Sequence, residues 1–290
     1  MLKYIYKSFA TFALSLIALS SSSLSGQEWF DANGEFWQPL SIRTAYQTGT
    51  GIGRNVGYST IAAFYCPEAV CDTITPYLDV RLHYTNKKRW AGNFGVGAQK
   101  VLQTCDSTSL VRGYVYYDFR NSSYRKHEQV TVGAEWFGSC YDLHLNTYWP
   151  IFREGHAHRF GRVFRYHRGG FHAQREHNEF TWRGAELLIS KQYPFFELFS
   201  LYASVGPYYF NSRHHSTFGV KGRVETVVYK DLALALQTSY DHHFGWRGYA
   251  ELSWTMPLVN DCCCEPTCCV PVLREELIVL TKACQWHKNF

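Results

Sequence analysis

Residues 77–84 read YLDVRLHY, and residues 218–228 read FGVKGRVETVV. In the first stretch, leucine, valine and tyrosine alternate with aspartate, arginine and histidine. Successive side chains of an extended strand point to opposite faces, so each stretch has one apolar face and one polar face. This two-residue alternation returns about a dozen times along the chain, as in a lipid-embedded barrel whose polar side lines a lumen. It predicts an all-β fold, an antiparallel transmembrane β-barrel of about 12 strands.

The first 26 residues have the three-part layout of a signal peptide. Lys3 and Lys7 give a positive start, residues 9–19 an apolar core, and residues 23–25 a small-residue cleavage region. A membrane-spanning helix is the alternative, but the apolar run is shorter than the roughly 20 residues that a bilayer requires. We therefore expect an exported protein with residues 1–26 as signal peptide.

The strands are located from alternation and from the turn residues between them. They divide the chain into a β-barrel domain (residues 27–258) and a Cys-rich C-terminal tail (residues 259–290). Aromatic residues make up 17% of the chain, which suits a large β-sheet with aromatic girdles. The twelve expected strands are 40–46, 58–65, 74–84, 90–99, 110–119, 127–136, 141–149, 181–190, 199–209, 218–229, 232–240 and 246–256.

The lengths of the connections predict which end of the barrel faces the cell. Outer-membrane barrels have short periplasmic turns and longer outside loops. Residues 138–139, 192–194 and 230–231 look like short turns, whereas residues 150–180 form one long insertion. The insertion is therefore expected outside, and Cys66, Cys71, Cys105, Cys140 and the cysteine cluster of the tail on the periplasmic side.

Several strands also carry a family resemblance. Residues 113–118 (GYVYYD), 132–136 (VGAEW) and 143–150 (LHLNTYWP) are similar to consecutive motifs of the inverse autotransporter barrels, the membrane domains of the intimin and invasin adhesins. The resemblance covers roughly residues 57–258. It implies a twelve-stranded outer-membrane barrel whose C-terminal chain passes back through the lumen. Only a short tail follows Pro257, too short for an Ig-like passenger, so the adhesin activity of the family is not expected here.

Ten cysteines in an exported chain indicate access to disulfide chemistry. Five of them form a cluster whose adjacent members cannot easily bridge one another, because disulfide geometry restricts their separation. Bonds to other cysteines of this chain or to other envelope proteins are one interpretation; a zinc site is another, although paired C-x2-C spacing is missing. The candidate cross-linking residues are Cys262, Cys263, Cys264, Cys268, Cys269, Cys284, Cys66 and Cys71.

The 150–180 insertion is rich in arginine and histidine. Its histidines are too loosely spaced to indicate a metal site strongly. A basic outer loop can attract anionic lipopolysaccharide or glycans, or it can simply be a solvated surface loop. The candidate basic residues are Arg159, Arg162, Arg165 and Arg168.

Charged residues on the polar faces of neighbouring strands would line the lumen. They can act as selectivity residues of a channel. They can equally form a ladder of charges that satisfy one another across strands, which we favour because even a pore must pair its buried charges. These candidates are Lys221, Arg223, Glu225, Arg247 and Glu251.

Together these features predict a bacterial outer-membrane protein in contact with lipid, with a structural or surface-interaction role and a tail that can cross-link it to other envelope proteins. The alternative is a porin-like channel for small solutes. A soluble β-sandwich, with the apolar faces packed together, is a third possibility. No catalytic arrangement, cofactor or metal is expected, and a net charge of +5 is too small to indicate a nucleic-acid partner.

Overall fold

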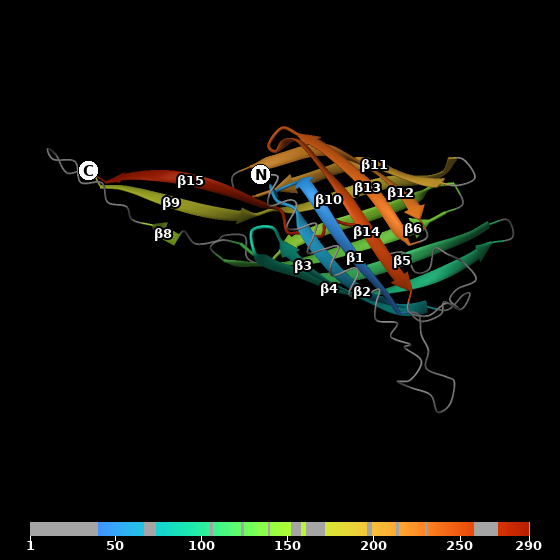
Figure 1. Ribbon diagram of the computed structural model, residues 1–290. Helices are drawn as coiled ribbons and strands as arrows, with labels where there is room; N and C mark the ends of the chain where they lie inside the picture. Colours follow the sequence, from blue (N-terminus) through green and yellow to red (C-terminus); the bar gives the residue numbers. More distant parts are fainter. Residues whose placement is uncertain are drawn as a thin grey trace, which may run out of the picture. The chain divides into compact units, whose positions relative to one another are not determined.

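Twelve antiparallel strands close into a barrel, and three further strands form a separate sheet (Figure 1). The computed structural model describes residues 40–66, 74–104, 107–122, 125–138, 140–151, 158–160, 172–195, 199–212, 215–229, 231–257 and 272–289. The predicted signal peptide lies outside the described residues. The barrel strands are β1 (Leu40–Thr50), β2 (Tyr58–Tyr65), β3 (Ile74–Thr85), β4 (Arg89–Thr104), β5 (Ser107–Asn121), β6 (Lys126–Phe137), β7 (Asp142–Pro150), β10 (Arg183–Phe195), β11 (Phe199–Asn211), β12 (Ser216–Tyr229), β13 (Leu232–Asp241) and β14 (Gly245–Pro257).

Consecutive strands pair with one another, and the first strand closes the barrel on the last. β1 pairs with β14 from Ser41↔Pro257 to Thr50↔Gly248. β7 pairs with β10, so residues 151–182 leave the wall and return to it between neighbouring strands. Closure leaves no unpaired edge in the barrel. A sheet that spans a membrane needs this, because the lipid hydrocarbon offers no hydrogen-bond partners. The predicted fold class and strand number are confirmed.

The alternation of the sequence becomes the two faces of the wall. On β3, Asp79, Arg81 and His83 are at most 3% exposed, whereas Val80 and Leu82 are about 40% exposed on the other side. Val132, Val205, Val220 and Leu236 extend the same outward apolar surface over other strands. The polar side chains therefore face the lumen, and the outer surface has the character that contact with lipid demands.

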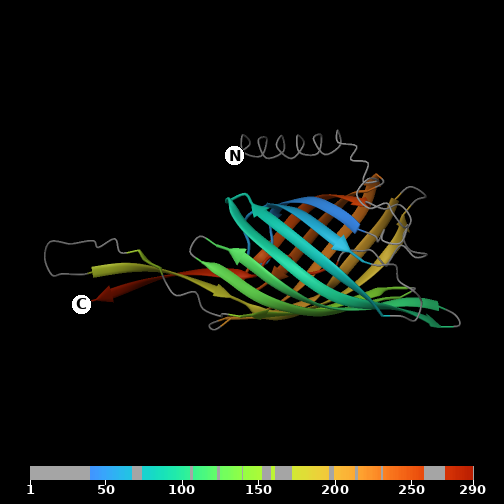
Figure 2. The same ribbon diagram turned by 90° about the horizontal axis from the view of Figure 1, so that it is seen from below.

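The long insertion and the tail contain strands that the sequence did not predict. β9 (His172–Thr181) pairs with β8 (His158–Phe160) and with β15 (Leu280–Asn289), which lies beside it in both views (Figures 1 and 2). Part of the insertion is therefore sheet, contrary to the expected loop. The expected turn at residues 192–194 is also wrong, because β10 continues to Phe195.

The two ends of the barrel differ in their connections. At one end, here called the turn end, β4 and β5 are separated by two residues and β12 and β13 also by two. At the other, the loop end, the chain between β7 and β10 holds β8 and β9. Within the described residues, no helix has the length and apolar character to cross a bilayer.

Candidate functional site in the barrel lumen

The lumen holds a stretch of the C-terminal tail. Residues Val272–Thr281, here called the luminal segment, run from an irregular stretch into the start of β15. Arg274 and Glu275 are each 7% exposed, and Ile278 is 1% exposed. Residues of such polarity are rarely this buried unless they are paired, so the partners of the segment decide how it is held.

Three consecutive charged residues of the segment each pair with a different wall strand. Arg274 Nη2 lies 2.7 Å from the Asp118 carboxylate on β5, and its guanidinium lies 4.3 Å from the centre of the Tyr116 ring. On β12, Lys221 Nζ lies 3.2 Å from Glu275 and 2.5 Å from Glu186 of β10. The lysine therefore bridges a wall carboxylate and a segment carboxylate.

Glu276 has several partners across the lumen from Lys221, on β1, β2 and β3. Arg81 Nη1 lies 3.2 Å from its carboxylate, and Arg43 Nη1 lies 3.9 Å away. The Tyr58 hydroxyl donates a hydrogen bond to it at 2.8 Å. Residues 274–276 carry one positive and two negative charges. Each of the three thus lies beside a wall residue of opposite charge.

The backbone of the segment is satisfied by wall side chains. Asn146 Nδ2 donates to the Leu273 carbonyl and Asn93 Nδ2 to the Glu276 carbonyl, both at 3.0 Å. The Glu275 N–H donates to the Tyr148 hydroxyl at 2.9 Å. Buried backbone groups need such partners because an unpaired one costs free energy comparable to a lost hydrogen bond. Side chains of the wall therefore replace the ladder that a strand would provide.

Three apolar clusters in the described part of the lumen each contain one residue of the segment. Val272 packs with Phe64, Cys66, Tyr77, Tyr114 and Tyr116; Leu277 packs with Tyr58 and Ala91; and Val279 packs with Ile52, Tyr148, Trp182, Tyr208 and Phe210. Phe64 and Cys66 lie at the turn end, and Ile52 and Trp182 at the loop end. The segment therefore runs through the lumen from the turn end to the loop end.

The connection between β1 and β2 folds onto the segment at the loop end. Ile52 is 2% exposed, and the Arg54 guanidinium lies over the rings of Tyr58 and Tyr249, 4.8 and 4.4 Å from their centres. Gly53 has a φ of +64°, and a Cβ at this position would lie 2.7 Å from the Leu280 nitrogen. Only glycine combines this backbone conformation with so close an approach.

Aromatic residues surround the segment where it leaves the lumen. The Trp182 N–H of the backbone donates to the Val279 carbonyl at 3.2 Å, and its ring nitrogen donates to Thr281 Oγ1 at 2.7 Å. The Trp182 ring lies 4.9 Å from the ring of His243, which is in turn 5.2 Å from His215. Burial, followed by the neighbouring His215, lowers the pKa of His243 below its ordinary value.

The predicted lumen residues fall into two groups. Lys221, Arg223 and Glu251 are buried and face inward, and Arg223 lies 3.3 Å from Glu251. Glu225, with a third of its side chain exposed, lies 2.6 Å from Arg223. Arg247 sits near the loop end, where it donates to Asn55 Oδ1 at 2.7 Å. Among the described contacts of these five residues, Lys221 is the one that reaches the luminal segment, through Glu275.

The cysteines within the described residues lie near both ends of the barrel. Cys66 is buried beyond the end of β2, and Gln99 Nε2 donates to its sulfur at 3.0 Å. Cys140 is exposed between β6 and β7, also at the turn end. Cys284 belongs to β15, opposite His177 of β9, past the loop end. The remaining candidates lie outside the described residues, as does Cys105: Cys71, Cys262, Cys263, Cys264, Cys268 and Cys269.

Of the candidate basic residues, only Arg159 lies within the described residues. It belongs to β8 and stands opposite Glu176 of β9 in the register. Arg162, Arg165 and Arg168 lie outside the described residues.

The wall residues that pair with the segment can be recognised from the sequence only as inward-facing. Asp118 and Arg81, for example, both lie at polar positions of alternating strands. Alternation shows that such a residue faces inward but leaves its partner undetermined. Glu276 and Arg274 carry no periodic pattern, and the tail sequence was compatible with a short helix as well as with an extended plug.

Comparison with solved structures shows the fold class. A chain solved in a study of the in-meso crystallization of membrane proteins is similar with a TM-score of 0.58 and 10% identity, over 84% of this chain and 100% of that one. The chain is also similar to the KdgM porin, with a TM-score of 0.41 and 8% identity over 74% of this chain and 98% of that one. It is similar as well to the COG4313 outer-membrane channel of Pseudomonas putida F1, with a TM-score of 0.45 and 12% identity over 78% of this chain and 100% of that one. No protein-family model matches the chain, and no curated protein matches it either.

The first similarity exceeds a TM-score of 0.5 and, at 10% identity, shows a shared fold. The shared fold is a closed antiparallel β-barrel. The resemblance to the inverse autotransporter type stays a prediction.

Proposed function

We propose that this chain is a bacterial outer-membrane barrel whose lumen is closed by its own C-terminal segment, with a structural or surface-interaction role. In this role the barrel holds the C-terminal chain and leads it from the turn end, in the periplasm, to the loop end, outside. The barrel contacts membrane lipid through its outward apolar face. No catalytic role is proposed, and no nucleic-acid partner.

The observation that carries this proposal is the pairing of Arg274, Glu275 and Glu276 with three sides of the wall. Breaking one buried pair typically costs about 3–5 kcal/mol, because it leaves an uncompensated charge. Three such pairs, with an apolar residue of the segment in each of three clusters, hold the chain inside the barrel. A solute channel needs the opposite, a lumen from which such a segment is easily displaced.

Conductance in planar bilayers tests the proposal. We expect the full-length protein to give few and brief openings. Removal of residues 272–290 should produce a stable conductance, because the lumen then loses Arg274, Glu275 and Glu276 together with their apolar neighbours. The difference in mobility between boiled and unboiled samples on a gel would verify that the shortened barrel still folds.

The porin-like alternative makes a different prediction for the same experiment. A large, steady conductance of the full-length protein, unchanged by the removal of residues 272–290, would favour a channel for small solutes. If neither the full-length nor the shortened protein conducts, some other part of the chain fills the lumen.

We further propose that the cysteine cluster of the tail links the barrel to other envelope proteins. The oxidising periplasm supports this proposal. Non-reducing electrophoresis of the protein from intact cells should show species larger than the monomer that disappear with reductant. A single monomeric band in both conditions would contradict it.

A further inference from the structure

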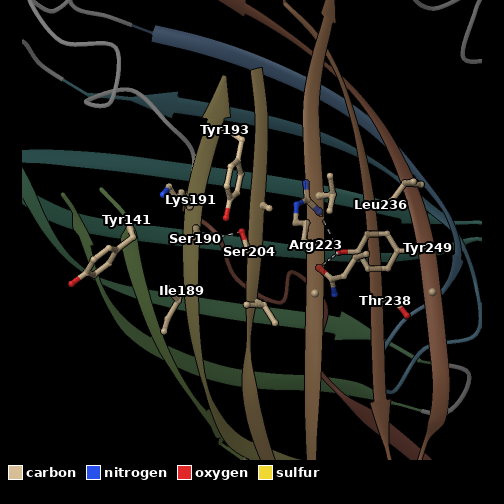
Figure 3. A pocket seen from close by; sticks show the side chains of 16 residues that line it. Tyr141, Ile189, Ser190, Lys191, Tyr193, Ser204, Arg223, Leu236, Thr238 and Tyr249 are labelled. Carbon is tan, nitrogen blue, oxygen red and sulfur yellow. Dashed lines mark hydrogen bonds between the residues drawn. The ribbon is translucent and has the colours of Figure 1, made fainter. Parts of the chain in front are cut away.

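A groove lies on the outer face of the barrel wall, away from the lumen. It crosses β10 to β14 and has a volume of about 850 Å³, within the range of ligand sites (Figure 3). Its apolar borders come from side chains on the outward face of the strands: Ile189, Val205, Val224 and Leu236.

The floor of the groove consists of small residues that stand side by side in the register. Gly222 is opposite Thr238, and Thr238 is opposite Gly248. The two glycines have no side chain, so the groove reaches the backbone there. This is why residues whose side chains face the lumen, such as Arg223, also border it.

One end of the groove is charged and aromatic. Lys191 lies exposed on the outward side of β10, four residues before the strand ends at Phe195 near the turn end. Its Nζ lies 5.4 Å from the centre of the Tyr193 ring, and Tyr141 borders the same region (Figure 3). Tyrosines and lysines concentrate where a membrane-spanning surface meets the lipid headgroups.

We propose that this groove binds one anionic phospholipid, with an acyl chain over Gly222, Thr238 and Gly248 and the phosphate at Lys191. This inference rests on the membrane location proposed above. The charge complementarity of Lys191 and a phosphate selects an anionic headgroup. The apolar length of the groove selects an acyl chain, and the smooth backbone floor lets the chain lie close to the wall.

Two substitutions separate the two halves of the proposed site. Lys191→Gln removes the charge and keeps most of the stem. Gly222→Leu fills the floor; a Cβ at this position meets only the Ser204 carbonyl, at the ordinary distance of 3.7 Å, so the barrel tolerates it.

Matched controls lie on another part of the wall. Gly113 on β5 is also exposed on the outward face, and a Cβ there meets nothing within 4 Å, so Gly113→Leu adds the same bulk outside the groove. Lys100 lies near the turn end of β4, at an outward position of the alternation, so Lys100→Gln removes a similar charge.

The experiment uses the full-length protein inserted into bilayers of phosphatidylethanolamine and phosphatidylglycerol, extracted in mild detergent and weighed by native mass spectrometry. We expect one retained phosphatidylglycerol per barrel. Lys191→Gln should lower its retention about fivefold, the equivalent of roughly 1 kcal/mol. Gly222→Leu should remove lipids with either headgroup, whereas Gly113→Leu and Lys100→Gln should retain the lipid.

Several results would overturn the proposal that the groove binds a lipid. These are equal retention by all five proteins, no retained lipid, or equal retention of both headgroups by the unchanged protein. A dimer that Gly222→Leu dissociates would show that a second copy of the chain occupies the groove instead. A barrel that inserts but retains no lipid overturns this inference alone, whereas failure to insert would also overturn the proposed membrane role.

Discussion

The wall strands and the luminal segment are held in place by different forces. Each wall strand is hydrogen-bonded to two neighbours over most of its length, so β12 pairs with β11 over eleven residues and with β13 over ten. Residues 272–279 have no strand partner. Their position depends on side chains such as Asp118, Lys221 and Arg81.

This difference predicts different responses to substitution. Backbone hydrogen bonds form with almost any residue, so the wall tolerates many changes that preserve the alternation. A side-chain ligand has one chemistry and one geometry. A single substitution in the luminal segment should therefore displace it while the barrel remains closed around an emptied lumen.

The largest effect on closure is expected from Arg274→Asp. This substitution replaces a buried ion pair by two carboxylates at the position where Arg274 and Asp118 lie 2.7 Å apart. Losing one partner of a buried pair costs about 3–5 kcal/mol, and like charges add to that cost. We expect frequent channel openings in planar bilayers, and little change in the mobility shift of the folded barrel.

The exchange of both charges provides the control. Arg274→Asp combined with Asp118→Arg restores an attractive pair, so closure should return in part. Recovery will be incomplete, because Asp118 also accepts hydrogen bonds from Asn93 and Thr131 that an arginine cannot accept. A single variant that stays closed would show that the ion pairs do not hold the segment.

The strands of the wall could be predicted from the sequence because alternation is a local signal. Each of the twelve expected strands overlaps a strand of the barrel. Errors arose where that signal weakens: the turn expected at residues 192–194 belongs to β10, since the proline there does not end the strand. β9 was missed because its polar residues 172–179 (HAQREHNE) carry no apolar alternation.

The luminal segment could not be placed by the same reasoning. Residues 272–280 (VLREELIVL) suit a short helix as well as an extended chain, and their hydrogen-bond partners on the wall are 38 to 218 residues distant in sequence. Only the family resemblance pointed to passage through the lumen. Buried carboxylates such as those of Glu275 and Glu276 require partners, but the choice among the inward-facing arginines and lysines depends on the closed barrel.

A smaller effect on closure is expected from Gly53→Ala. Alanine at a φ of +64° costs about 1–2 kcal/mol, and its Cβ would lie 2.7 Å from the backbone nitrogen of Leu280. Gly245→Ala is the matched control, because Gly245 has a φ of +66° and nothing within 4 Å of an added Cβ. Both variants should lower stability toward urea, but only Gly53→Ala should raise the frequency of channel openings. Equal behaviour of the two would mean that the β1–β2 connection does not press on the segment.

The smallest effect on closure is expected from Arg223→Leu, although the barrel itself should lose stability. Arg223 is buried, as Arg274 is, yet its partners Glu225 and Glu251 both belong to the wall. Glu251 keeps its pair with Arg43, so the free energy of unfolding in urea should fall by about 1.5–3 kcal/mol, the range for hydrogen bonds to a charged group. Conductance should stay as low as in the unchanged protein, because no contact of the segment is lost. If Arg223→Leu instead opened the lumen as widely as Arg274→Asp, the wall and the segment would form one cooperative unit, and the distinction between a self-supporting wall and a segment held by its side chains would be wrong.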